Sequence, residues 1–190
     1  GDPAKTDLPN YFADLVVSGN SVSGASVPGS EALRCRRPYG GTLCVGQPGA
    51  VTREVRGPLK GAGDWTHQYA NAANTTCSDD DLIRGPLTVL WFGIPHQKQA
   101  DRHTRPAAPL FAAGRIFVQG LDDIRALDAY NGHLLWVFPL ESFARRYGRG
   151  PLNLMAGVSV SGGNMCTDGK VLYVHKGDVC LRIDAATGKK

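Results

Sequence analysis

The most informative part of the chain reads Gly114-Arg-Ile-Phe-Val-Gln-Gly-Leu-Asp-Asp-Ile-Arg-Ala-Leu-Asp128-Ala-Tyr-Asn-Gly132-His-Leu-Leu-Trp136. A second copy follows as Gly169-Lys-Val-Leu-Tyr-Val-His-Lys-Gly-Asp-Val-Cys-Leu-Arg-Ile-Asp184-Ala-Ala-Thr-Gly188-Lys-Lys190, in which Asp184 lies 56 positions after Asp128. Because self-similarity at a fixed spacing is the signature of repeat architectures, these two copies are the first evidence on the fold.

Each copy predicts a β-hairpin followed by a tight turn. β-rich runs over 116–119 and 171–175 each lead through a polar turn into a second apolar run that ends in Asp. The pattern Asp-x-x-x-Gly then follows, in which the carboxylate accepts hydrogen bonds from main-chain amides and glycine supplies a positive φ. In the first copy a third strand over 134–138 carries a tryptophan. These structural positions of the repeat are Asp128, Gly132, Trp136, Asp184 and Gly188.

A three-stranded meander of this kind cannot bury both of its faces alone, so it must stack on similar units. Radial stacking gives a propeller, in which Trp136 packs between neighbouring sheets. The 24 glycines and 12 prolines favour short strands and many turns, and therefore a mainly β fold. Upstream, the apolar run over 82–93 predicts an entry strand into the first sheet, followed by a connecting loop over 94–108.

The amino-terminal part of the chain has a different pattern. It predicts a strand over 11–18, a short helix over 31–37 and a second strand over 42–46, which together form half of an α/β unit. The composition shifts near 57–63. We therefore predict two domains, over residues 1–60 and 61–190.

The two repeats resemble the pyrroloquinoline-quinone (PQQ) type of propeller repeat. The resemblance rests on Ala126-Leu127-Asp128-Ala129-Tyr130-Asn131-Gly132 and on Arg182-Ile183-Asp184-Ala185-Ala186-Thr187-Gly188. It implies a partial, quinoprotein-like β-propeller over roughly residues 63–190. The same repeat serves both quinoprotein dehydrogenases and assembly scaffolds, so it implies a fold more than an activity.

The amino-terminal segment is similar to the carboxy-terminal half of a Rossmann-like, class I S-adenosylmethionine-dependent methyltransferase domain, on residues 13–18 and 33–43. The whole chain resembles large bacterial, planctomycete-like proteins that fuse such a domain to a quinoprotein-like propeller. The glycine-rich cofactor loop and the ribose-binding acid of a methyltransferase are missing, and the second repeat stops where its next strand is due. We therefore expect a fragment of a larger protein.

A quinoprotein dehydrogenase holds its quinone between a tryptophan and a disulfide of adjacent cysteines, beside a calcium ion. No two cysteines are adjacent here. Under this alternative Trp65 or Trp91 supplies the stacking face, and Asp64, Asn71 or Asn74 supplies oxygen ligands. Structural packing is the favoured interpretation of these residues, so we predict no catalytic residue, no metal site and no cofactor; PQQ and calcium belong only to the dehydrogenase alternative.

The remaining candidate side chains form no known catalytic or metal-binding motif. His67, His96, His103, His133 and His175 have neither HxH nor HExxH spacing, and no GxSxG marks a nucleophile. Asp79-Asp80-Asp81 predicts a solvated turn that caps the next segment, and Asp122-Asp123 a hairpin turn. The five cysteines, without a CxxC pair, are predicted to be buried and unpaired thiols, with one disulfide in an extracytoplasmic setting as the alternative.

Function is therefore predicted as a non-catalytic scaffold or protein-interaction module, which binds protein partners or itself through strand edges. The alternatives are a PQQ-dependent dehydrogenase and part of a methyltransferase. The net charge of +4 forms no aromatic-interleaved basic stripe, so we predict no nucleic-acid partner, and no apolar run is long enough for a membrane span. The propeller resemblance favours the periplasm or cell envelope, whereas the methyltransferase resemblance favours the cytoplasm.

Overall fold

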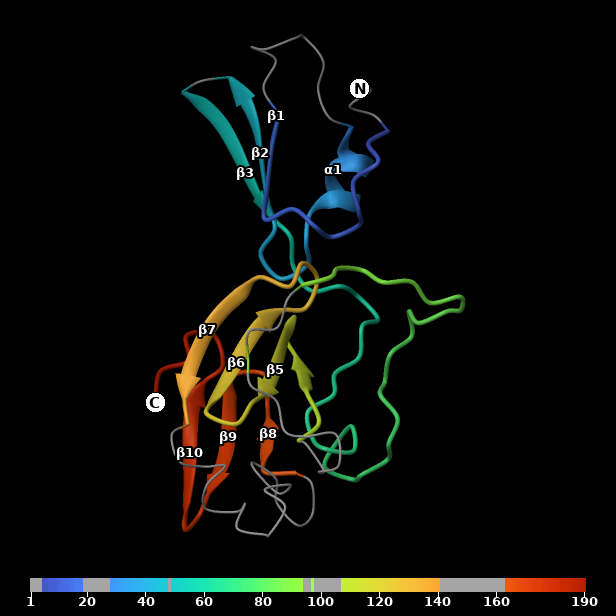
Figure 1. The fold of residues 1–190 in the computed structure, drawn as a ribbon. Helices are drawn as coiled ribbons and strands as arrows, with labels where there is room; N and C mark the ends of the chain where they lie inside the picture. Colours follow the sequence, from blue (N-terminus) through green and yellow to red (C-terminus); the bar gives the residue numbers. More distant parts are fainter. Residues whose placement is uncertain (1–4, 19–27, 48, 94–96, 98–106, 141–162) are drawn as a thin grey trace. The chain divides into compact units, whose positions relative to one another are not determined.

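The computed structural model describes residues 5–18, 28–47, 49–93, 97, 107–140 and 163–190 (Figure 1). Within these ranges the chain forms ten strands and one helix, so the predicted mainly β fold is confirmed. Contacts divide the chain into two compact units. The first comprises Gly1–Lys60 with Arg84–Phe92, and the second Gly61–Ile83 with Gly93–Lys190.

The first unit is a three-stranded sheet with one helix. Its elements are β1 (Leu15–Ser18), α1 (Gly29–Cys35), β2 (Thr42–Gln47) and β3 (Ala50–Val55). β1 pairs parallel with β2, and β2 pairs antiparallel with β3. The predicted strand, helix and strand are therefore confirmed, with shifted bounds. β1 starts later than predicted because Tyr11 has a φ of 60° and Ala13 makes only an isolated bridge, to Arg36.

The second unit contains two antiparallel sheets, which Figure 1 shows side by side. The first sheet has the order β4-β5-β6-β7 and consists of β4 (Leu110–Ala112), β5 (Arg115–Gln119), β6 (Asp123–Asp128) and β7 (Leu134–Pro139). The second has the order β10-β9-β8 and consists of β8 (Met165–Thr167), β9 (Val171–Lys176) and β10 (Val179–Asp184). Both predicted hairpins, β5–β6 and β9–β10, are confirmed.

The two sheets pack their apolar faces against each other. Along β6 every second residue is buried, as expected for a strand with one covered face. The rings of Phe117 and Trp136 lie 5.9 Å apart at this interface. Burying a large apolar side chain stabilises a fold by roughly 1.5–3 kcal/mol, so this shared core is what holds the second unit together. Its buried members are Leu110, Phe117, Ile124, Ala126, Trp136, Leu140, Met165, Leu172, Val174, Ile183 and Ala185.

The structure also contains strands that the sequence analysis did not predict. β4 adds a fourth strand to the expected three-stranded meander, and β8 plays the same part in the second sheet. Both are only three residues long, too short for a visible alternation of apolar and polar residues. β3 was likewise not predicted, because all six of its residues are exposed and its pattern shows no buried face.

Two further predictions are wrong. Residues 82–93 form no strand, since these apolar residues are mostly exposed and Leu87 is 78% exposed, and Arg84–Phe92 groups with the first unit. The five thiols are unpaired as predicted, but they are not all buried: Cys35 is buried, whereas Cys77 and Cys180 are exposed. Cys180 points away from the core because its strand neighbours Leu181 and Ile183 take the covered face.

Candidate functional site: a cationic pocket beside the repeated turn

The same tight turn ends the hairpin in both sheets. In the first, the Asp128 carboxylate accepts hydrogen bonds from the main-chain N–H groups of Tyr130, at 2.9 Å, and Asn131, at 3.3 Å. The main-chain N–H of Gly132 donates to the carbonyl oxygen of Asp128 at 2.9 Å, and the N–H of Asp128 donates to the carbonyl oxygen of His133 at 2.8 Å. Gly132 has a φ of 74°, which a residue with a Cβ adopts only at a cost.

In the second sheet Asp184 repeats these bonds and adds another. Its Oδ1 accepts hydrogen bonds from the N–H groups of Ala186, at 3.1 Å, and Thr187, at 2.8 Å, and from the Thr187 hydroxyl at 2.7 Å. The N–H of Asp184 donates to the carbonyl oxygen of Lys189 at 2.7 Å, and Gly188 has a φ of 70°. The Thr187 hydroxyl and then the turn amides, which favour the charged carboxylate, lower the pKa of Asp184 from its ordinary value.

Strand register is also conserved between the two hairpins. Phe117 pairs with Ala126 in the first, and Tyr173 pairs with Arg182 in the second. Each position in the second pair lies 56 residues after its counterpart. The hairpins are therefore the same structure built from different side chains, and any position in one can be compared directly with its counterpart in the other.

Trp136 joins the two repeats. Its indole Nε1 donates a hydrogen bond to the carbonyl oxygen of Ala185, 3.1 Å away in the turn of the next repeat. The same ring lies against Gly188, where an added Cβ would stand 2.7 Å from the indole. Thus Asp184 shapes the turn, Gly188 leaves room in it, and Trp136 packs into that room.

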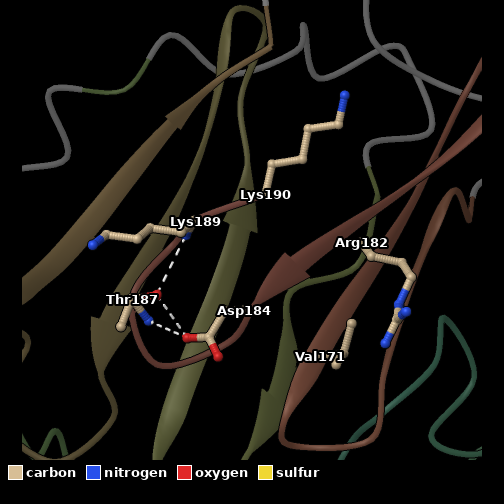
Figure 2. Close-up of a pocket in the computed structure, with 6 residues that line it drawn as sticks. All are labelled: Val171, Arg182, Asp184, Thr187, Lys189 and Lys190. Atoms are coloured by element: carbon tan, nitrogen blue, oxygen red, sulfur yellow. Dashed lines mark hydrogen bonds between the residues drawn. The ribbon is translucent and has the colours of Figure 1, made fainter.

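A pocket of about 500 Å³ lies beside the second turn, as Figure 2 shows. Three of its lining side chains are cationic, and the Asp184 carboxylate among them is bound by Thr187 of its own turn. Positive charge therefore exceeds negative charge around this pocket. The lining residues are Val171, Arg182, Asp184, Thr187, Lys189 and Lys190.

The outer face of the second sheet continues from this pocket and differs from its counterpart in the first sheet. Phe117, Ile124 and Ala126 are fully buried in the first sheet, covered by the second. Their counterparts are Tyr173, Cys180 and Arg182, of which Cys180 and Arg182 are exposed. The face that is an apolar contact in the first repeat therefore carries an exposed arginine and an exposed thiol in the second.

Trp65 and Trp91, the stacking candidates of the dehydrogenase alternative, belong to different units: Trp91 to the first and Trp65 to the second. Trp65 is held by its main chain, which exchanges two hydrogen bonds of 2.8 Å with Phe111 of β4. The carbonyl oxygen of the next residue, Thr66, accepts a hydrogen bond of 3.0 Å from the N–H of Thr167 in β8. This segment therefore bonds through its main chain to the first strand of each sheet.

The oxygen ligands of the dehydrogenase alternative make local contacts where the structure describes them. The Asn71 side-chain oxygen accepts hydrogen bonds from Ala73 and Thr75 of its own turn. Burial raises the pKa of Asp64, and a hydrogen bond with the main chain of Ala113 opposes that shift. Across the part of the chain that the structure describes, no three His, Cys, Asp or Glu side chains are grouped to hold a metal ion.

The other predicted candidates have structural surroundings. His67 Nδ1 lies 2.8 Å from the Thr66 hydroxyl, and His175 is exposed beside Cys180 on the outer face of the second sheet. His133 belongs to the first turn, whereas His96 and His103 lie outside the described residues.

The two acidic clusters, Asp79-Asp80-Asp81 and Asp122-Asp123, make local contacts in their own segments. Asp80 caps the segment that follows it, accepting hydrogen bonds of 2.8 Å from the N–H groups of Leu82 and Ile83. Asp123 forms an ion pair of 2.9 Å with Arg125. Neither arrangement leads to a catalytic site.

Sequence reasoning missed the pocket cations Arg182, Lys189 and Lys190. A signal was present, since three cations surround the Asp184 turn within nine residues. Their convergence depends on the hairpin register, which the sequence alone does not give.

No protein-family model and no curated protein matches the chain. Among solved structures, it is similar to a quinohemoprotein alcohol dehydrogenase from Pseudomonas putida, with 23% identity over 67% of this chain and a TM-score of 0.46. The chain spans 18% of the length of that protein. No helix in the described ranges has the length and apolar character needed to cross a membrane.

Proposed function

We propose that the second unit is part of a β-propeller of quinoprotein-like repeats and works as a non-catalytic scaffold that binds protein segments at its strand edges. The observation that carries the proposal is the outer edge of β7. In the first sheet, of order β4-β5-β6-β7, no strand among the described residues pairs with the outer side of β7. An unpaired edge presents main-chain donors and acceptors to another chain.

The stacking of the repeats supports the propeller part of the proposal. Two consecutive meanders share one core, and Trp136 of the first packs on Gly188 of the second. Repeating this contact between further sheets produces radial stacking. The domain division at residues 60 and 61 belongs to the same proposal, with the amino-terminal segment as a methyltransferase-like remnant and the periplasm or cell envelope as the compartment.

Exposed apolar side chains on β7 support the binding part. Leu134, Leu135 and Val137 are 53%, 41% and 46% exposed. β7 lies at the end of its sheet. A partner strand paired along this edge would cover these side chains and satisfy the edge amides, which is the usual mode of β-strand addition.

Sedimentation velocity over a range of protein concentrations tests edge-mediated binding. We expect the wild-type chain to associate with increasing concentration, and the double variant Leu135→Lys/Val137→Lys to remain monomeric because lysine on an edge disfavours pairing. Leu87→Lys is the control, since Leu87 is also an exposed apolar residue but lies in no strand. A wild-type chain that is monomeric at every concentration, or association that survives the double substitution, would contradict the proposal.

A further inference from the structure

We infer that Asn74 is an acceptor site for N-linked glycosylation, on an exposed loop of the second unit. The inference goes beyond the proposed scaffold function and rests on its proposed compartment, because Asn-x-Thr acceptors are used in proteins that leave the cytoplasm. Three observations lead to it: the sequence of the loop, its exposure, and the hydrogen bonds of its two asparagines.

The sequence of the loop contains the acceptor pattern. In this pattern a serine or threonine stands two positions after an asparagine, and the residue between them is not proline. Asn74-Thr75-Thr76 has this pattern, and it is the single match among the seven asparagines of the sequence. A modified chain would therefore carry its oligosaccharide at one position.

The loop presents the whole pattern to solvent. Asn74, Thr75 and Thr76 are all exposed and belong to no helix or strand. The loop is nevertheless ordered by its main chain. The N–H of Asn74 donates to the carbonyl oxygen of Asn71 at 3.0 Å, and the N–H of Thr76 donates to that of Tyr69 at 3.2 Å. A bulky oligosaccharide on this turn would extend into water without displacing packed side chains.

Asn71 in the same loop provides a comparison. Its side chain closes the turn, since Nδ2 donates to the Thr75 hydroxyl at 2.6 Å and Oδ1 accepts from the N–H groups of Ala73 and Thr75. Ala73 also stands where the pattern requires a hydroxyl. In the part of the chain that the structure describes, the Asn74 side chain makes no hydrogen bond. The fold thus uses the Asn71 amide and leaves that of Asn74 available.

The reaction needs a donor and a transferase from outside the chain. The donor is an oligosaccharide linked through a pyrophosphate to a membrane lipid. The bond between its first sugar carbon and the pyrophosphate oxygen breaks, and the lipid pyrophosphate leaves with the electron pair of that bond. A new bond forms between the same carbon and Nδ2 of Asn74, which gives up one proton to a base of the transferase. No oxidation or reduction takes place.

Modification of the purified, folded chain tests the inference. The chain is incubated with a lipid-pyrophosphate-linked oligosaccharide and a single-subunit oligosaccharyltransferase that accepts Asn-x-Thr, and its intact mass is then measured. We expect a gain of one oligosaccharide per wild-type chain. A peptide N-glycosidase should remove this gain and leave aspartate in place of Asn74, which peptide mass spectrometry locates.

Substitutions locate the acceptor. Asn74→Asp should abolish the gain because it removes the acceptor nitrogen, and aspartate tolerates the φ of 55° at this position. Thr76→Ala should also abolish the gain because it removes the hydroxyl of the pattern, whereas Thr76→Ser should retain it. Asn71→Asp is the matched control within the loop, since it keeps an oxygen acceptor for the turn and should leave the gain unchanged.

Two results would overturn the inference. One is a wild-type chain that is folded by circular dichroism and stays unmodified under these conditions. The other is a gain in mass that persists in Asn74→Asp. Neither result bears on association, which sedimentation of the Leu135→Lys/Val137→Lys variant tests separately.

Discussion

The indole Nε1 of Trp136 donates a hydrogen bond to the carbonyl oxygen of Ala185, 49 residues later in the chain. Ala185 itself is fully buried, and its N–H donates to the carbonyl oxygen of Lys170. One tryptophan on an edge strand therefore recognises the turn of the following repeat by shape and by a directional bond. This contact couples the stability of the two sheets.

Replacing Gly188 with alanine should destabilise the second unit by about 2–4 kcal/mol. Two effects combine: a φ of 70° is strained for alanine, and the new Cβ would stand 2.7 Å from the Trp136 ring. Urea unfolding followed by circular dichroism measures the loss. Gly169→Ala is the control, because Gly169 also has a positive φ but meets its neighbours at an ordinary 3.6 Å. Equal losses for the two variants would show that packing against Trp136 contributes nothing.

Trp136→Phe should cost about 1–3 kcal/mol in the free energy of unfolding. Phenylalanine leaves the Ala185 carbonyl oxygen without its indole donor and leaves part of the space beside Gly188 unfilled. The same urea titration applies, with Trp91→Phe in the first unit as the comparison. A Trp136→Phe chain as stable as the wild type would mean that the indole is not an anchor.

Thr187→Val should raise the pKa of Asp184 toward its ordinary value, because the Thr187 hydroxyl is the main cause of the lowered pKa. A lowered pKa in the folded state adds stability above the unfolded value of about 3.9, and this stability is lost as the pH falls through the folded pKa. Wild type and variant should therefore differ in stability near neutral pH and converge in acid. NMR titration of the carboxyl groups measures the pKa directly. Asp168 serves as the internal reference, since main-chain hydrogen bonds, first that of Val171, lower its pKa.

Alkylation should distinguish the thiols by their surroundings. Cys77 and Cys180 are exposed and should react first with iodoacetamide, whereas Cys35 is buried. Burial raises the pKa of Cys166, which reduces its reactive thiolate, so this thiol should also react slowly. Peptide mass spectrometry over a time course gives the order. In guanidinium chloride the differences should disappear, and early modification of Cys166 in the folded chain would contradict the described β8.

The sequence predicted what local chemistry controls. The Asp-x-x-x-Gly turns and the apolar runs before them predicted both hairpins and the strand of Trp136. Hydrogen bonding within the turn and alternation along the strand depend only on residues that are close in sequence. The sequence predicted that Trp136 packs between repeats but not which residues it contacts. Spacing indicates that repeats stack, but it does not give the register between them.

Features that depend on distant or main-chain contacts were not predictable. β4 and β8 are too short to show alternation, and the apolar residues over 82–93 gave a misleading strand pattern although they are mostly exposed. The pocket beside Asp184 is lined by Arg182 from β10 and by Lys189 and Lys190, which follow the turn. Residue types identified these groups as charged, but only the register of β10 brings Arg182 and Lys189 to one place.

The pair Trp65 and Thr66 has a mechanical consequence. Trp65 bonds to Phe111 of the first sheet, and Thr66 accepts a bond from Thr167 of the second. Sliding one sheet past the other by a single residue would break one of these attachments, because adjacent residues on one peptide can shift only together. The dipeptide thus resists sliding of one sheet past the other. A force applied along the strands would be carried by these main-chain hydrogen bonds as well as by side-chain packing.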